Sequence, residues 1–151
     1  MGLDMFLEKR KNASQEVGYW RKANAIHNWF VENVQNGEDD CWSYAVTKEQ
    51  IEELLELCKE VKKNCELVDG KILLGRTLKD GKWEDEYGDG KVIKDASFAK
   101  THLPTRAGFF FGDTDYDEYY LEGINDTIDI LTRVLQETDF DNETIYYSSS
   151  W

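Results

Sequence analysis

Three Asp-Gly pairs, at residues 69–70, 80–81 and 89–90, most constrain the fold of this chain of 151 residues. They separate short runs of β-forming residues, KILLGRTL, KWEDEY and KVIKDASF, and Asp-Gly between such runs is typical of a tight hairpin turn. The sequence predicts a protruding β-hairpin arm over about 67–98, inserted into a single domain that spans residues 1–151.

Three other segments have the periodicity of amphipathic helices. The clearest begins at Thr47, which Gln50 follows at the spacing of a capping box, and its apolar face continues to Cys65. A second predicted helix spans about 19–34 and a third about 114–136, where apolar residues recur every three or four positions. We expect these three helices to cover one sheet.

Short β-like runs flank the predicted helices. Residues 3–8 alternate apolar and polar side chains, and GFFFG at 108–112 looks like a short buried strand between glycines. The tail ETIYYSSSW, residues 143–151, is expected to pair with the first strand. Together with the hairpin, this order predicts the α+β class, with a small antiparallel or mixed sheet covered by three helices.

The formal net charge of −13 limits the partners of the chain. A protein this acidic does not hold duplex DNA through general attraction to phosphates. The charge is uneven, because residues 1–35 carry five Lys or Arg against four Asp or Glu, and the remainder therefore carries −14. We expect that a small anion can bind near the N-terminal segment while long polyanions are repelled.

Targeting signals are also missing from the sequence. No stretch approaches the ~20 apolar residues of a membrane span. The N-terminus MGLDMFLEKR lacks the basic start and long apolar run of a signal peptide. We therefore expect a cytoplasmic protein without a membrane partner.

Motifs for metals and cofactors are weak. DTDYDE, residues 113–118, resembles the start of a calcium-binding loop, but Glu118 stands where glycine is required and Ile124 where a bidentate glutamate is required. These acids are expected to cap and charge the start of the third helix, and EDD at 38–40 is interpreted as a solvated loop. No phosphate-binding glycine loop occurs. We expect no metal, no cofactor and no catalytic residue.

The segment GYWRKANAIHNWF, residues 18–30, brings flat rings, amides and cations together within a few turns. A nucleobase requires a stacking face and an edge partner, whereas its phosphate requires Arg or Lys. This role requires that the side of the helix bearing Trp20, Asn24 and His27 be reachable; core or interface packing is the competing interpretation. The predicted ligand-binding residues flank the core stripe or lie near the second aromatic run: Trp20, Arg21, Asn24, His27, Asn28, Arg106, Phe109 and Tyr116.

At this point the sequence shows a resemblance. GLDMFL, GYWRKANAIHNWFVENVQNG, GFFFG with TDYDEYY, and the terminal YYSSSW together resemble a widespread family of small, mostly uncharacterised phage-encoded proteins. This resemblance implies a counter-defence role, similar in character to sponges that sequester the cyclic nucleotide signals of bacterial immunity, including anti-CBASS proteins that bind cyclic dinucleotides. Such sponges are commonly homo-oligomers with sites at subunit interfaces, so we expect a homo-oligomer here.

Two other functions remain open from the sequence. The −14 carried by residues 36–151 suits an acidic inhibitor that occupies the nucleic-acid groove of a host defence protein. A nucleotide-processing hydrolase that uses His27, His102 or the acidic cluster is the third possibility, although no local pattern of nucleophile and base supports it.

Overall fold

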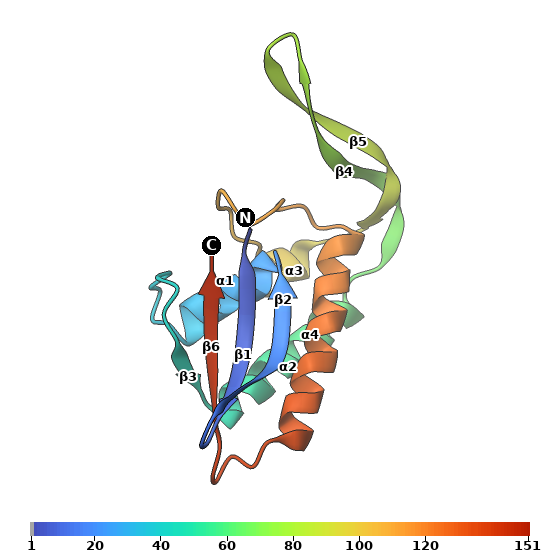
Figure 1. Cartoon of the computed structure of the whole chain (residues 1–151). Helices are drawn as coiled ribbons and strands as arrows, with labels where there is room; N and C mark the ends of the chain where they lie inside the picture. The colour runs from blue at the N-terminus through green and yellow to red at the C-terminus, as the bar shows by residue number, and fades with distance from the viewer. Residues whose placement is uncertain (1) are drawn as a thin grey trace.

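The body of the protein is built on a four-stranded antiparallel sheet, shown in Figure 1. The computed structural model describes residues 2–151. The sheet contains β1 (Asp4–Arg10), β2 (Ser14–Arg21), β6 (Thr144–Ser150) and β3 (Tyr44–Val46), in the spatial order β2-β1-β6-β3. β1 pairs with β6 over its whole length, which confirms the expectation that the tail pairs with the first strand.

One face of this sheet forms the core. Met5 and Leu7 of β1 and Ile145 and Tyr147 of β6 are completely buried, whereas the residues between them are only partly covered. The alternation in residues 3–8 therefore predicted the buried face correctly. In Figure 1 α1 and α2 pass behind the sheet, and α4 runs along its side next to β2.

Within residues 2–151 the structure has four helices, one more than expected. They are α1 (Asn24–Asn33), α2 (Lys48–Lys63), the short α3 (Ser97–His102) and α4 (Glu118–Glu137). The fold is α+β, as predicted. At the start of α2 the Thr47 hydroxyl accepts from the Gln50 amide at 3.1 Å and the Gln50 side chain accepts from the Thr47 amide at 2.9 Å, which confirms the capping box.

The segment 19–34 is not one helix. Tyr19, Trp20 and Arg21 are the last residues of β2, and the helix begins only at Asn24. The physical reason is pairing with β1, because residues 19–21 lie opposite Phe6, Met5 and Asp4. Gly18 lets the strand pass beneath α4, since a Cβ there would lie 2.7 Å from Cγ2 of Ile130. Tyr19, expected in the core, instead points to the open face of the sheet and is exposed.

GFFFG, predicted as a strand, is a turn in the loop 103–117 between α3 and α4. Phe111 is buried, but Phe109 is 95% exposed. A positive φ of 83° at Gly112 turns the chain immediately after the aromatic run. The third predicted helix starts later than expected as well, because Asp117 and not Thr114 is the N-cap of α4.

The predicted arm is one long hairpin that extends away from the body in Figure 1. β4 (Leu67–Lys79) and β5 (Lys82–Ile93) pair with each other along the hairpin, and at its base Val92 also forms an isolated bridge to Asp117. Of the three Asp-Gly pairs, only Asp80–Gly81 forms the turn, with φ of 51° and 77°. Both residues of a two-residue hairpin turn of this kind have positive φ, which glycine accepts without strain.

Candidate functional site

Trp20 and Arg21 lie at the end of β2 and point to opposite faces of the sheet. The Trp20 ring is buried at 4% exposure, and its Nε1 donates to Thr127 Oγ1 of α4 at 2.9 Å. The Arg21 guanidinium is on the open face and pairs with Asp4 Oδ1 at 3.1 Å. Trp20 therefore serves the contact between the sheet and α4, and its ring has no free face for a base.

Asn24 connects α1 to the loop 103–117. Its Nδ2 donates to the carbonyl oxygens of Phe111 and Asp113, both at 2.9 Å, and its Oδ1 accepts from the Arg106 amide at 3.1 Å. The side chain is 5% exposed, and its hydrogen bonds all go to the backbone of that loop. Asn24 thus holds the loop in place and has little capacity left for a ligand.

His27 is completely buried between the sheet and the loop 35–43. Its Nε2 lies 2.9 Å from Asp39 Oδ1 and its Nδ1 lies 2.6 Å from the Tyr147 hydroxyl. A carboxylate only accepts, so Nε2 carries the proton and the Tyr147 hydroxyl donates to Nδ1. Burial lowers the pKa of His27 from its ordinary value of 6.5, which favours this neutral tautomer.

Asp39 and Arg106 complete this polar group. Asp39 accepts from Trp151 Nε1 at 3.0 Å and lies 3.4 Å from Arg106 Nε. Arg106 also donates to Asn28 Oδ1 at 2.9 Å. EDD at 38–40 was interpreted as a solvated loop, which is wrong for Asp39, because its side chain is only 14% exposed and bonds three others.

We call these seven residues the anchoring network: Asn24, His27, Asn28, Asp39, Arg106, Tyr147 and Trp151. It ties α1, the loop 35–43, the loop 103–117 and the C-terminal end together. Five of the eight predicted ligand-binding residues therefore form hydrogen bonds within the chain. Four of them belong to this network, and the fifth is Trp20, which bonds Thr127. The requirement that Trp20, Asn24 and His27 be reachable is not met.

The remaining predicted residues differ in exposure. Phe109 is almost fully exposed on the loop 103–117, whereas Tyr116 is half-buried and its hydroxyl accepts from the Thr105 amide at 3.1 Å. Arg21, on the open face, lines a hollow beside α4. The accessible part of the predicted ligand-binding surface is therefore not on α1. It consists of Arg21, at the end of β2, and Phe109, on the loop 103–117.

Lys22 lies between Arg21 and Phe109 and was not among the predicted ligand-binding residues. It joins β2 to α1 in a left-handed conformation with φ of 57°, which is uncommon for a residue other than glycine. Its aliphatic stem runs over Gly112, where an added Cβ would lie 3.5 Å from it. Among the described residues, Lys22 has no carboxylate within ion-pairing distance, so its ammonium group has no fixed partner.

Two adjoining hollows meet at Lys22. The α4-side hollow has a volume of about 480 Å³ and the arm-side hollow about 800 Å³, within the usual range for small-molecule sites. Both are lined by Lys22, Gly112, Asp113 and Asp115.

Each hollow also has aromatic rings and an arginine of its own. The α4-side hollow adds Tyr19, Tyr119 and Arg21, and the arm-side hollow adds Tyr87, Phe109 and Arg76. All four rings are exposed. The lining therefore offers stacking faces on both sides of one central cation.

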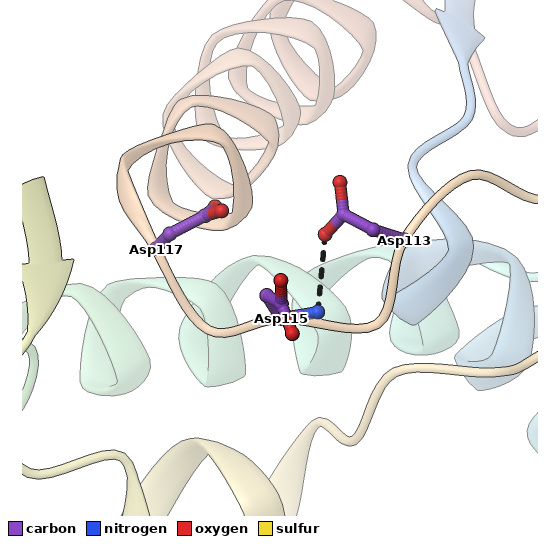
Figure 2. A group of neighbouring side chains, drawn as sticks. All are labelled: Asp113, Asp115 and Asp117. Carbon is purple, nitrogen blue, oxygen red and sulfur yellow. Dashed lines mark hydrogen bonds between the residues drawn. The ribbon is translucent and has the colours of Figure 1, made fainter. Parts of the chain in front are cut away.

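Three aspartates converge at the start of α4, as Figure 2 shows. Asp113, Asp115 and Asp117 each place a carboxylate oxygen within 4.8 Å of the others. Asp117 Oδ1 accepts from the amides of Tyr119 and Tyr120, and Asp113 Oδ1 accepts from the Asp115 amide at 3.1 Å. Capping α4 was the role expected of this group, and Asp117 performs it. We assign no metal to the group.

Comparison with known proteins adds no family. No family model matches the chain, and neither the curated proteins nor the solved structures contain a significant match. In residues 2–151, no helix has the length and apolar character that crossing a bilayer requires.

Proposed function

We propose that this chain is a non-enzymatic phage counter-defence protein that sequesters a cyclic dinucleotide signal in the host cytoplasm, at the two hollows around Lys22. The resemblance of the sequence to small phage proteins supports the context. The observation that carries the proposal is the arrangement of the lining: one shared lysine, with aromatic rings and one arginine on each side of it.

This arrangement matches the chemistry of a cyclic dinucleotide, which has two bases joined through two phosphates. Each base can stack on an exposed ring, Tyr19 or Tyr119 in one hollow and Tyr87 or Phe109 in the other. Stacking of this kind contributes about 1–3 kcal/mol per base. The phosphates are expected to meet the unpaired ammonium group of Lys22 between the two hollows.

The carboxylates around Lys22 restrict the ligand. Asp113 and Asp115 line both hollows and repel any phosphate that is not held at Lys22. Carboxylates accept hydrogen bonds, so they can bind the amino edge of adenine or guanine. This predicts a preference for purine signals over pyrimidine signals, and weak or no binding of long polyanions such as duplex DNA.

Sequestration requires a nanomolar dissociation constant, which corresponds to about −12 kcal/mol. We expect isothermal titration calorimetry against a panel of cyclic di- and trinucleotides to find at least one member in that range. Absence of heat and of thermal stabilisation with every member would remove the proposal. Mass spectrometry of the ligand after denaturation should return it intact, whereas a linearised or hydrolysed product would identify an enzyme.

A second candidate is an acidic inhibitor of a host defence protein. Residues 67–93 carry five Lys or Arg against six Asp or Glu, so the rest of the chain carries −12 and is the acidic part of the protein. Such a body can mimic the phosphates of a nucleic acid. Capture of a host nucleic-acid-binding protein that is released by salt, with no nucleotide binding in calorimetry, would favour this candidate.

A further inference from the structure

The two hollows differ in the carboxylates that each adds to the aspartates they share. The arm-side hollow adds Asp85, whose Oδ1 accepts from Arg76 Nε at 2.7 Å. The α4-side hollow adds Glu122 and Asp126, which are both exposed. Within residues 2–151, neither of these two side chains forms an ion pair or a hydrogen bond. The α4-side hollow therefore has two carboxylates that no other side chain of the fold engages.

These carboxylates lie in line with an aromatic ring on α4. Tyr119, Glu122, Gly123 and Asp126 line the hollow at the spacing i, i+3, i+4 and i+7, so they share one face of the helix. The Tyr119 side chain is 53% exposed. Residues three apart on a helix have Cβ atoms about 5–6 Å apart, a distance that a stacked base and one hydrogen bond at its edge can span. A base that stacks on Tyr119 can therefore present its edge to Glu122.

Gly123 leaves open space between the two carboxylates. Glycine inside a helix is destabilising relative to alanine, because it loses more backbone freedom on folding. Packing does not require glycine at this position, since an added Cβ would meet only the Cβ of Ala23, at 3.9 Å. The missing side chain instead widens the hollow beside Tyr119 and Glu122, where a base would lie.

We infer that Glu122 binds the edge of a guanine base in the α4-side hollow, so that the preferred ligand contains at least one guanine. This inference rests on the proposed function. Guanine has two neighbouring donors on its edge, N1–H and the 2-amino group, and a carboxylate has two acceptor oxygens that match them. Adenine has one donor, its 6-amino group, beside the acceptor N1, which a carboxylate repels. The pair with guanine is also charge-assisted, which strengthens both of its hydrogen bonds.

The charge of the hollow determines which part of the ligand enters it. Four carboxylates line the α4-side hollow, against the two cations Arg21 and Lys22. Arg21 already pairs with Asp4 at 3.1 Å. A phosphate is therefore repelled from the interior of the hollow and is held at its Lys22 end, so the base is the part that enters.

Calorimetric titration of three cyclic dinucleotides tests the inference on the full chain. Cyclic di-GMP and cyclic GMP–AMP should bind with similar affinity, because one guanine is sufficient, and cyclic di-AMP should bind at least about tenfold more weakly. Equal binding of all three, or tightest binding of cyclic di-AMP, would overturn the inference and keep the proposed function. Cyclic GMP–AMP that binds as weakly as cyclic di-AMP would also overturn it, because both hollows would then require guanine. Absence of binding by all three would remove the proposed function as well.

Glu122→Gln tests the residue itself. A glutamine side chain has one acceptor and one donor group, which match the edge of adenine and not that of guanine. The ratio of the affinities for cyclic di-GMP and cyclic di-AMP should therefore fall at least about tenfold. Asp129→Asn changes another exposed acid of α4 that lies outside both hollows, and it should keep the wild-type ratio. An unchanged ratio in Glu122→Gln would overturn the inference.

Gly123→Leu tests the position of the base without changing any charge. Leucine is a better helix former than glycine, so the variant should unfold at a temperature no lower than the wild type does. Its side chain should fill the space beside Glu122 and weaken the binding of cyclic di-GMP at least about tenfold. A folded variant that binds cyclic di-GMP as tightly as the wild type would show that the base lies elsewhere.

Discussion

The Tyr147 hydroxyl donates to His27 Nδ1 at 2.6 Å, and this contact joins the last strand of the sheet to the first helix at the centre of the core. The opposite ring nitrogen donates to Asp39, so the imidazole has both of its hydrogen-bonding positions filled. Residues that the sequence suggested for ligand binding therefore hold the structure together. The accessible surface lies next to them, around Lys22.

Tyr147→Phe should destabilise the protein by about 1–3 kcal/mol, because it leaves the buried His27 Nδ1 without a donor. The free energy of unfolding in urea measures this. The matched control is Tyr146→Phe, the next residue on the same strand, whose ring lies under Arg10 on the other face of the sheet. Equal losses in the two variants would contradict the role assigned to the His27 contact.

Acidification should destabilise the protein below about pH 6.5. Burial lowers the pKa of His27 from 6.5, so the unfolded chain binds a proton in this range more readily than the folded one. The neutral His27 therefore contributes its full stability above pH 6.5 and loses it progressively as the pH falls. One proton can account for at most about 1.4 kcal/mol per pH unit.

Urea unfolding between pH 7.5 and 5.5 measures this dependence. The pKa values of carboxyl groups such as Asp4 and Glu8 are lowered from their ordinary values of 3.8 and 4.5. The stability that these groups contribute is lost only at a pH below this window. His27→Gln should be less stable at pH 7.5 but should show a flatter profile. A profile as steep as that of the wild type would assign the proton to another group.

Asn24→Ala should loosen the loop 103–117 before it unfolds the body. The variant removes three hydrogen bonds to the backbone of that loop, including the one from the Arg106 amide. Hydrogen exchange measured by mass spectrometry should show faster exchange in peptides covering 105–113, with β1 and β6 unchanged. Unaltered exchange in the loop would mean that other contacts hold it.

Gly18→Ala tests the path of β2 beneath α4. An added Cβ would lie 2.7 Å from Ile130 Cγ2, and overpacking of this kind costs about 1–3 kcal/mol. Adding Ile130→Ala should recover part of that loss, although Ile130→Ala alone destabilises. Simple additivity of the two changes in urea unfolding would contradict the close approach.

The strong local signals in the sequence predicted most of the fold. The structure confirms three of them: the capping box at Thr47, the alternation in residues 3–8 and the Asp80–Gly81 turn. Each of these features depends on residues that are close together in the sequence. The segment 19–21 was misassigned because Tyr19 and Trp20 fit a helical stripe as well as an alternating strand. Pairing with β1, which the local pattern does not reveal, decides between them.

The site was predicted less well, for the same reason. Tyr147 bonds His27 from 120 residues away and Trp151 bonds Asp39 from 112 residues away. Asp39 in turn pairs with Arg106, and nothing near these residues in the sequence indicates the contacts. Lys22 has one local signal, its place between a strand and a helix, but its left-handed backbone is set by the fold. Of the predicted ligand-binding residues, only Arg21 and Phe109 are left exposed by the fold and so remain available for the binding that we propose.

The most direct test of the account is calorimetric titration of a cyclic purine dinucleotide into Lys22→Gln and into Lys63→Gln, a matched change at the distant end of α2. If Lys22 holds the phosphates, Lys22→Gln should bind at least about tenfold more weakly than the wild type, since a charge-assisted hydrogen bond contributes about 1.5–3 kcal/mol. Lys63→Gln should bind normally. Equal affinity of both variants and the wild type would contradict a phosphate site at Lys22.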